Sequence, residues 1–412
     1  MKFTVNEHVV LRDKPEGPLE PYIEAFAEYI SDQGYSVFSI HRHVLRAACF
    51  SGWLMKKGVE QQQITSEHPH QYLHCRSHQV RLCAGNVAAL EHLMKFLRNN
   101  KLIPDVVVVE PPLTSLERCA RAYEQYLRDT RGLAEVTIVN YVPFICAFLE
   151  HRFGTSVVRL SNIRANDIVE FVQVRVSRMQ RNRTKLLTCA LRSFLNYARY
   201  SGEVTLDLAA AVPVVPNWSR PSIPRAISAD QINRLLSSID RSSATGRRDY
   251  AILLLLARLG LRSSEVVFIE LENIDWDKGT LSVQGKGGRF NTFPLPPDVG
   301  KAIAEYLKNG RPTCSTRRLF VRVKAPIQGF RGPCGVGSVV RHALKRCDVD
   351  APTFGAHQFR HGLATEMLRG GASLPEIGDV LGHQNPQTTM IYAKVDLEAL
   401  RSLAIAWPGA VR

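Results

Sequence analysis

Two proline-rich segments are the sequence feature that most constrains the fold. They are residues 103–115 (IPDVVVVEPPLTS) and 212–226 (VPVVPNWSRPSIPRA). Proline fixes φ and has no backbone N–H, so a helix cannot run through either segment. A chain of 412 residues is also long for a single hydrophobic core. We therefore predict three domains, formed by residues 1–104, 105–224 and 225–412.

The first two of these domains share a sequence pattern. Residues 25–54 and 121–149 each contain an aromatic helix pattern, a glycine turn, a Ser/Thr start and a second apolar helix pattern. Residues 89–96 (ALEHLMKF) and 190–197 (ALRSFLNY) match each other as well. Such self-similarity predicts two four-helix units in tandem, and a fold that is mainly α.

The charge of the chain points to a polyanionic partner. The net charge is +15, with 45% hydrophobic residues, which is typical of a folded protein with a basic surface. Double-stranded DNA is the favoured partner. A membrane surface is the alternative, but no Lys/Arg block adjoins an amphipathic, Trp-bearing helix. The apolar run at residues 250–261 is too short to span a bilayer.

The N-terminus shows no secretory signal pattern, and nine scattered cysteines form no C-x-x-C motif. We therefore expect reduced thiols in a cytoplasmic protein. One histidine- and cysteine-rich stretch, residues 67–83, raises the question of a metal site. Strong zinc sites pair their ligands across two short knuckles, so a solvated or DNA-facing patch is favoured, and no metal is expected. The residues in question are His68, His70, His74, Cys75, His78 and Cys83.

A basic run crosses the middle domain at residues 175–200. Three of its positions, 178, 181 and 185, would share one face of a helix and could follow a line of phosphates. A solvated charged face is an equally good interpretation. Because no aromatic residues alternate with the charges, duplex contact is favoured over single-strand stacking. The candidate DNA-binding residues are Arg175, Arg178, Arg181, Arg183 and Lys185.

In the third domain, polar candidates lie at the ends of predicted elements. Residues 247–260 form a buried helix that Gly260 ends, which puts Arg262 in a turn before the next helix. Residues 279–285 and 289–296 alternate as two strands of a hairpin, with Lys286 at its glycine-rich tip.

The C-terminal part of this domain adds further candidates. Residues 357–371 form a helix with His357, Arg360 and His361 on one face. The next helix starts with a capping box at Ser373 and Glu376 and ends at Gly382, just before His383. Asn385 caps a last helix, with Tyr392 two turns in.

The motifs GLRSSE, GKGGR, HQFRHG, LGH and IYAK, in this order and spacing, closely resemble those of the tyrosine recombinases, or phage-integrase family. The catalytic domain of this family is related to type IB topoisomerases. The resemblance covers residues 113–400. It implies a SAM-like helical core-binding domain followed by an α+β catalytic domain with a small sheet.

The resemblance also implies a role for each candidate. Arg262 and Arg360 are the catalytic arginines, and His357 forms the H-x-x-R pair with Arg360. The hairpin lysine, the second histidine and the nucleophile are Lys286, His383 and Tyr392. The family pattern does not require His361, which we interpret as a histidine with a structural role.

The chemistry of these residue types agrees with that implication. Two guanidiniums can bind the non-bridging oxygens of a phosphodiester bidentately, and histidines can hydrogen-bond them or relay a proton. The family implies a covalent 3′-phosphotyrosine and a lysine that protonates the 5′-oxygen. The sequence has neither an Asp/Glu cluster suited to Mg²⁺ beside these residues nor a G-x-x-x-x-G-K-[ST] loop, so no metal or ATP requirement is expected.

Three functions fit the sequence. The favoured one is a site-specific recombinase that integrates, excises or transposes DNA, and the others are a relaxing topoisomerase and a non-catalytic DNA-binding accessory. In the family, an apolar tail such as residues 394–407 docks on a neighbouring protomer of a tetramer on two duplexes; packing on its own domain is the equal alternative. Whether other recombinases take part is open. Residues 1–104 could lengthen the DNA footprint or bind such a partner.

Overall fold

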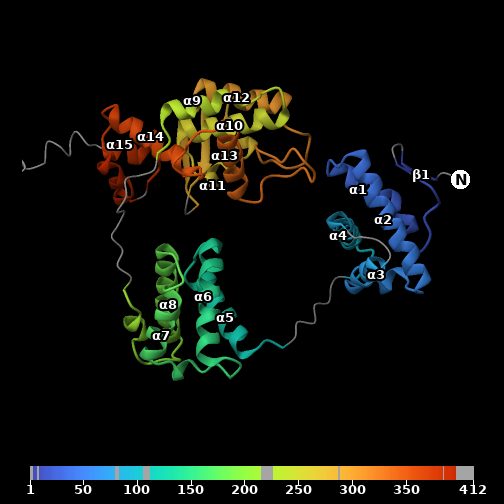
Figure 1. The fold of residues 1–412 in the computed structure, drawn as a ribbon, viewed down its shortest axis with the longest axis horizontal. Coiled ribbons are helices and arrows are strands. Elements are labelled where there is room, and N and C mark those ends of the chain that lie inside the picture. The colour runs from blue at the N-terminus through green and yellow to red at the C-terminus, as the bar shows by residue number, and fades with distance from the viewer. Residues whose placement is uncertain are drawn as a thin grey trace, which may run out of the picture. The chain divides into compact units, whose positions relative to one another are not determined.

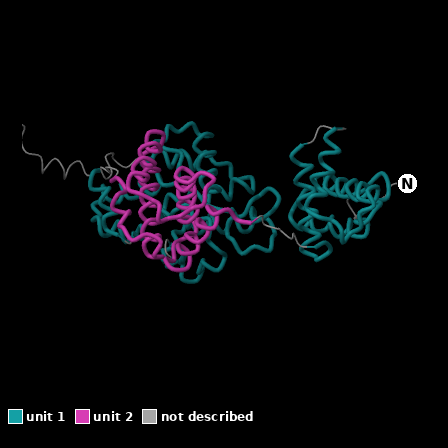
Figure 2. Tube along the Cα trace, turned by 90° about the horizontal axis from the view of Figure 1, so that it is seen from below, with its two compact units in different colours: residues 1–107, 222–412 teal, residues 108–221 magenta. Residues whose placement is uncertain are grey.

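The computed structural model describes residues 3–6, 9–78, 83–104, 112–214, 226–285, 288–383 and 385–395. Helices dominate these residues, and strands are few and short (Figure 1). The chain divides into two compact units, one of residues 108–221 and one of residues 1–107 together with 222–412 (Figure 2). Lys286, most of the apolar tail and most of both proline-rich segments lie outside the described residues.

Residues 1–104 combine a short hairpin with helices. Strands β1 (Phe3–Asn6) and β2 (Val9–Leu11) pair antiparallel. The helices are α1 (Ile23–Asp32), α2 (Val37–Lys56), α3 (Glu67–Ser77) and α4 (Ala84–Asn99). Ser36 starts α2 by accepting a hydrogen bond from the Ser39 amide. Phe26, Phe50 and Leu97 are fully buried in a core that these helices share.

Residues 108–221 repeat this order of helices around a core of their own. They form α5 (Ser115–Gln125), α6 (Glu135–Phe153), α7 (Ala165–Val176) and α8 (Arg181–Tyr200). A π-helical turn, Tyr126–Thr130, extends α5. A capping box of Thr114 and Glu117 fixes the start of α5.

The predicted basic helix face in this unit is wrong. The chain leaves α7 at Val176 and starts α8 at Arg181, and Gln180 takes an extended N-cap conformation with ψ 145°. Arg178 therefore lies in the connecting turn, while Arg181 and Lys185 lie on α8. The helical periodicity of the charges was read across a helix boundary, so the three positions share no single helix face.

Residues 226–395 form an α+β unit with one small sheet. Strands β3 (Ile274–Asp275), β4 (Thr280–Gln284) and β5 (Phe290–Pro294) pair antiparallel in that order. Leu281 and Val283 of β4 face the core, as the alternating pattern predicted. The helices are α9 (Ala229–Ser237), α10 (Ala244–Leu259), α11 (Ser263–Phe268), α12 (Pro297–Asn309), α13 (Cys334–Arg346), α14 (His357–Arg369) and α15 (Leu374–Val380), followed by a 3₁₀ helix, Pro386–Lys394.

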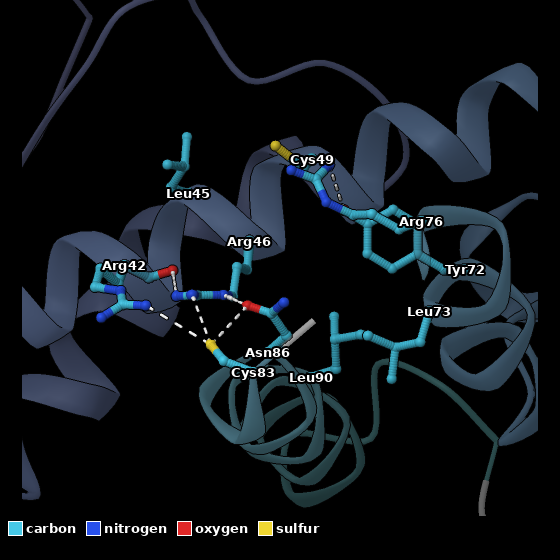
Figure 3. Close-up of a pocket in the computed structure, with 10 residues that line it drawn as sticks. All are labelled: Arg42, Leu45, Arg46, Cys49, Tyr72, Leu73, Arg76, Cys83, Asn86 and Leu90. Atoms are coloured by element: carbon cyan, nitrogen blue, oxygen red, sulfur yellow. Dashed lines mark hydrogen bonds between the residues drawn. The ribbon is translucent and has the colours of Figure 1, made fainter. Parts of the chain in front are cut away.

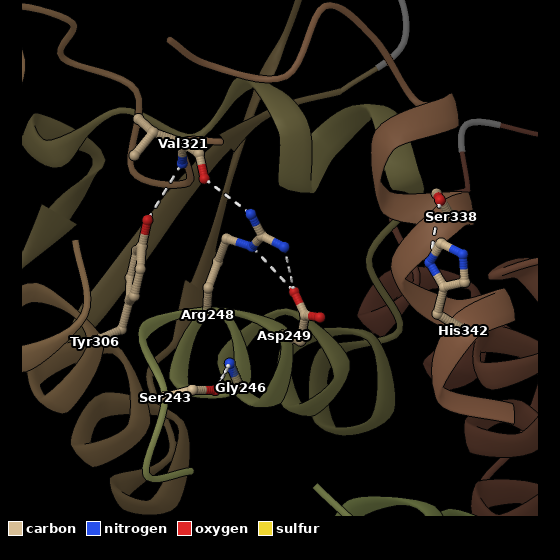
Figure 4. A network of polar contacts seen from close by, with 8 residues as sticks. All are labelled: Ser243, Gly246, Arg248, Asp249, Tyr306, Val321, Ser338 and His342. Carbon is tan, nitrogen blue, oxygen red and sulfur yellow. Dashed lines mark hydrogen bonds and ion pairs between the residues drawn. The ribbon is translucent and has the colours of Figure 1, made fainter. Parts of the chain in front are cut away.

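Helix α10 is the centre of this core, and a buried polar network fixes its first turns (Figure 4). Arg248 donates two hydrogen bonds to Asp249 Oδ1, at 3.0 and 2.7 Å, and a third to the Val321 carbonyl at 3.2 Å. The Val321 amide donates to Tyr306 Oη at 3.2 Å. Since both members of the ion pair are buried and hydrogen-bonded, the network ties α10 and α12 to the loop that precedes α13.

None of the described helices combines the length and apolar character needed to cross a bilayer.

Candidate active site

Arg360 on α14 is the residue that joins the elements of the site. Its side chain is 8% exposed. Nη1 donates to the Gly260 carbonyl at 2.8 Å, and Nη2 donates to the Leu381 carbonyl. These carbonyls close the C-terminal ends of α10 and α15, where helices leave backbone acceptors unsatisfied. Arg360 therefore holds two helix ends in fixed positions around its own charge.

Gly260 makes this arrangement possible. It ends α10 in the left-handed conformation, with φ +59°, and a methyl group added there would lie 3.0 Å from both Leu363 Cδ2 and Leu381 Cδ2. We expect Gly260→Ala to lower the free energy of unfolding by about 1–2 kcal/mol for the left-handed conformation and by about 1–3 kcal/mol more for overpacking. Gly279→Ala is the matched control, because Gly279 has φ +60° but open space around it. Thermal unfolding of the full chain that showed equal losses for both variants would contradict the packing argument.

Arg262 lies beside Arg360 at the start of α11. Its amide donates to Glu265 Oε2 at 2.7 Å, and its Nη1 lies 2.6 Å from Glu265 Oε1. The Glu265 side chain is 4% exposed, whereas that of Arg262 is 34% exposed. The ion pair with Glu265 thus holds a guanidinium that solvent can still reach.

The two arginines form a cationic site. Burial, and next the charge of Arg262, lower the pKa of Arg360 to about 10, while Glu265 and Tyr392 act in the opposite direction. Arg360 therefore remains charged at neutral pH, although burial and a like charge make that charge unfavourable. An anion between the two guanidiniums relieves this repulsion, as expected for a phosphate site.

Tyr392 reaches this site from the 3₁₀ helix. Its side chain is 1% exposed and packs with Ile377, Leu381 and Ala364. Its Oη lies 2.9 Å from His361 Nδ1, and the two rings meet edge to face at 5.7 Å. The phenol oxygen is therefore directed toward α14 and the arginine that this helix carries.

The sequence did not indicate this contact between His361 and Tyr392. Tyr392 lies 31 residues further along the chain, so no local pattern connects the two. The available signal was the helical spacing of His357 and His361, whose rings lie 5.8 Å apart. Burial, followed by the charges of His357 and Arg360, lowers the pKa of His361 to about 4. The imidazole is therefore neutral at pH 7.

This lowered pKa predicts a stability that depends on pH. The unfolded chain protonates His361 near pH 6.5 and the folded chain near pH 4, so the unfolded state binds more protons between these values. Stability should therefore fall as the pH drops from about 6.5 to about 4. We expect His361→Gln to reduce this loss. Thermal unfolding of both proteins across this range measures it, and identical pH profiles would contradict the assignment.

The side chain of His383 is hydrogen-bonded to the 3₁₀ helix that carries Tyr392. It follows Gly382, which has φ +60°, and its Nδ1 lies 2.7 Å from Thr389 Oγ1. The hairpin that carries Lys286 reaches the same turn: a methyl group added at either Gly382 or Gly285 would lie 3.0 Å from Asn291 Nδ2. Gly382 and Gly285, which precede His383 and Lys286 in the chain, thus both lie next to Asn291.

The other candidates lie elsewhere. All five candidate DNA-binding residues of the middle unit are exposed, and Arg175 and Arg183 lie 5.6 Å from the centres of the Phe171 and Phe144 rings. In the histidine-rich stretch the rings of His74 and His78 are 5.0 Å apart. Among the described residues, no three His, Cys, Asp or Glu side chains are grouped so that they could hold a metal ion.

Comparisons with known proteins match this geometry to a family. The model of the phage integrase family matches residues 225–398, and that of the phage integrase N-terminal SAM-like domain matches residues 120–202. The chain is 55% identical over 409 residues to a Sinorhizobium fredii protein named as an integrase/recombinase, y4rA, with 99% of each chain covered. It is 27% identical over 276 residues to tyrosine recombinase XerD of Listeria innocua, covering 66% of this chain and 91% of XerD.

Solved structures share the fold. XerH site-specific recombinase, in a post-cleavage complex with palindromic difH substrate, matches with a TM-score of 0.55 and 19% identity over 69% of this chain and 83% of its own. A lambda integrase dimer bound to a COC′ core site matches with a TM-score of 0.52 and 17% identity over 67% and 94%. These likenesses confirm the fold of a helical domain followed by an α+β domain. Given the relative that matches it from end to end, the chain belongs to the phage integrase family of tyrosine recombinases.

Proposed function

We propose that this protein is a site-specific DNA recombinase that breaks and rejoins DNA through a covalent 3′-phosphotyrosine, for the integration, excision or transposition of a mobile element. The observation that carries the proposal is the position of Tyr392 Oη, 2.9 Å from His361 on the helix that also supplies Arg360. Family membership supports the same reaction. So do the solved structures of XerH in a complex with difH substrate and of lambda integrase bound to a COC′ core site.

In the proposed reaction, Arg262 and Arg360 bind the two non-bridging oxygens of one phosphodiester. Tyr392 Oη attacks phosphorus, the bond to the 5′-oxygen breaks, and the products are a 3′-phosphotyrosine and a 5′-hydroxyl. The arginines stabilise the additional negative charge of the transition state. Lys286 donates the proton that the leaving 5′-oxygen takes up, and His357 and His383 hydrogen-bond the phosphate oxygens.

His361 takes the proton that Tyr392 loses. Its neutral Nδ1 accepts a hydrogen bond from the phenol before the attack. With a pKa of about 4, His361 is a weak base when no phosphate is bound. However, a phosphate on the two arginines adds a negative charge nearby, which favours the protonated imidazole. The proton acceptor is therefore strengthened by the substrate itself.

The proposed chemistry needs neither Mg²⁺ nor ATP. The two guanidiniums provide the positive charge that a metal ion supplies in other phosphoryl-transfer sites. Glu265, the carboxylate described at this site, is already paired with Arg262. The free energy of the broken phosphodiester is kept in the phosphotyrosine bond, so a second DNA end can be joined without a nucleotide cofactor.

Duplex DNA is the proposed partner, bound by the exposed basic residues of α7 and α8 and the turn between them as well as by the catalytic site. A homotetramer on two sites, with or without other recombinases, is the proposed assembly. We propose that the protein acts in the cytoplasm. The proposed domains remain residues 1–104, 105–224 and 225–412.

Trapping the covalent complex tests the function. The substrate is a duplex from the flanks of the gene with a nick near the cleavage site, so that the short piece with the new 5′-hydroxyl diffuses away after cleavage. A protein–DNA adduct should then accumulate. Peptide mapping should place the DNA on Tyr392. Attachment to another residue would refute the assignment. Joining of strands between two sites supports recombination, whereas relaxation of supercoiled DNA by the monomer, without joining, would favour the topoisomerase alternative.

A further inference from the structure

A pocket in residues 1–104 is not used by the proposed catalytic reaction (Figure 3). It has a volume of about 290 Å³ and lies among α2, α3 and α4. Three arginines line it, Arg42 and Arg46 from α2 and Arg76 from α3, and none of its lining residues is acidic. The pocket is therefore a concentration of positive charge in the domain that both family models leave unmatched.

Each arginine is held in place by neutral neighbours. Arg46 donates from Nε to Asn86 Oδ1 at 2.5 Å and from Nη1 to the Arg42 carbonyl at 2.9 Å. Arg42 lies over the Phe38 ring at 5.6 Å, and Arg76 donates to Tyr72 Oη at 3.2 Å. Within the described ranges, none of the three arginines forms an ion pair with a carboxylate. Fixed like charges without a protein counter-ion favour the binding of an external anion.

The sulfur of Cys83 marks where two of the three arginines of the pocket, Arg42 and Arg46, converge. Arg42 Nη2 lies 3.8 Å from Cys83 Sγ and Arg46 Nη2 lies 4.0 Å from it, as the dashed lines of Figure 3 show. Cys83 is also the N-cap of α4, so its sulfur lies near the N-terminal end of that helix. The Gly85 amide has the largest effect in lowering the pKa of the Cys83 thiol; burial opposes it, and the Asn86 amide and the charges of Arg46 and Arg42 lower the pKa further. Guanidiniums and helix N–H groups pointing at one place are the donors that bind phosphate oxygens.

The surroundings of the pocket distinguish a polymer from a small ligand. A larger groove of about 1380 Å³ shares Leu45, Cys49, Tyr72 and Arg76 with the pocket and continues past β2 to Lys56. Its charged lining residues are Arg12, Lys14, Lys56 and Arg76 together with the acidic Asp13 and Glu16. A site for a free nucleotide encloses most of its ligand. A shallow basic pocket that opens into a longer groove instead suits one phosphate of an extended chain.

We propose that this pocket binds a backbone phosphate of duplex DNA, with Arg42, Arg46 and Arg76 as its ligands and the N-terminus of α4 as an additional donor. The inference rests on the proposed function, because it takes the recombination substrate as the ligand. It gives residues 1–104 a DNA contact of their own. Contacts of this kind position a protein on DNA without reading its sequence.

Cys83 provides a direct test, since its exposed thiol lies within the pocket. The full chain is treated with iodoacetamide, with and without duplex DNA, and the alkylation rate of the Cys83 peptide is measured by mass spectrometry. We expect DNA to slow the alkylation of Cys83 at least about tenfold. Cys334, an exposed cysteine of the catalytic unit, is the internal comparison, and its alkylation rate should not change. Inorganic phosphate at millimolar concentration serves as the small-ligand probe.

The second arm is the salt dependence of DNA binding. Each phosphate contact contributes about 0.9 to the slope of log K against log salt. We expect Arg42→Gln/Arg76→Gln to reduce this slope by about 0.9 relative to Lys57→Gln/Lys95→Gln, a control with the same loss of charge at exposed positions of the same domain. Circular dichroism of both double variants confirms that they fold.

Three results would overturn the inference. These are an alkylation rate of Cys83 that DNA does not change, protection of Cys83 by inorganic phosphate but not by DNA, or equal salt slopes of DNA binding for both double variants. The covalent adduct of Tyr392 is measured in the same samples. Adduct formation without protection of Cys83 would show that the pocket does not bind DNA, while the proposed recombinase function stands. Protection of Cys83 without any adduct means that the catalytic proposal has failed while the pocket has not.

Discussion

Replacing Tyr392 with Phe should abolish the covalent protein–DNA complex. The variant keeps the buried ring, its packing against Ile377 and Leu381, and the surrounding cationic site, but it loses the oxygen that attacks phosphorus. Loss of a nucleophile reduces turnover by about 10⁴-fold or more. We expect no adduct on the nicked duplex by denaturing electrophoresis, with DNA affinity close to that of the wild type, since the phenol is not an exposed contact.

Tyr306→Phe is the matched control. Tyr306 is a fully buried tyrosine of the same domain, and its Oη accepts a hydrogen bond from the Val321 amide. Its loss should cost about 1–3 kcal/mol of stability because that amide is left unsatisfied. The control should still form the adduct at temperatures where it is folded. An adduct that persists in Tyr392→Phe would show that another side chain is the nucleophile.

Much of the catalytic domain could be predicted because its signals are local. Gly260 ends α10, Ser373 and Glu376 cap α15, and the alternating residues of β4 face the core as expected. The sequence placed Arg262 in a turn before a helix and Arg360 on a helix face for the same reason. Arg262 and Arg360 come close together because helix ends that are distant in sequence pack side by side. Before the fold was known, only the order of the family motifs could indicate this proximity.

The sequence was least informative where local signals were incomplete. The turn between α7 and α8 contains neither glycine nor proline, so the basic run was read as one helix and Arg178 was placed on the wrong element. His361 was judged from its own helix, whereas its neighbour Tyr392 comes from another. The pocket around Cys83 combines residues of three helices, whereas the sequence placed this cysteine in a histidine-rich stretch that was interpreted as a solvated or DNA-facing patch.

Arg360→Lys should reduce the rate of DNA cleavage although the positive charge is kept. One ammonium cannot donate to the Gly260 and Leu381 carbonyls and also present a flat pair of donors to a phosphate, because a lysine lacks the guanidinium fork. Loss of one well-placed donor to a developing oxyanion costs about 10²–10³-fold in rate. Each buried carbonyl left unsatisfied costs about 1–3 kcal/mol of stability.

Arg258→Lys makes the same substitution at an exposed position of the same domain. Arg258 pairs with Asp298 at 2.9 Å, and both side chains are about half exposed. Exchanging such a surface residue should change stability by no more than about 0.5 kcal/mol and leave the cleavage rate unchanged. Single-turnover cleavage and thermal unfolding of both variants separate the two effects. If Arg360→Lys cleaved at the wild-type rate, the fork geometry would be irrelevant to the chemistry, and Arg360 would act only by holding α10 and α15 together.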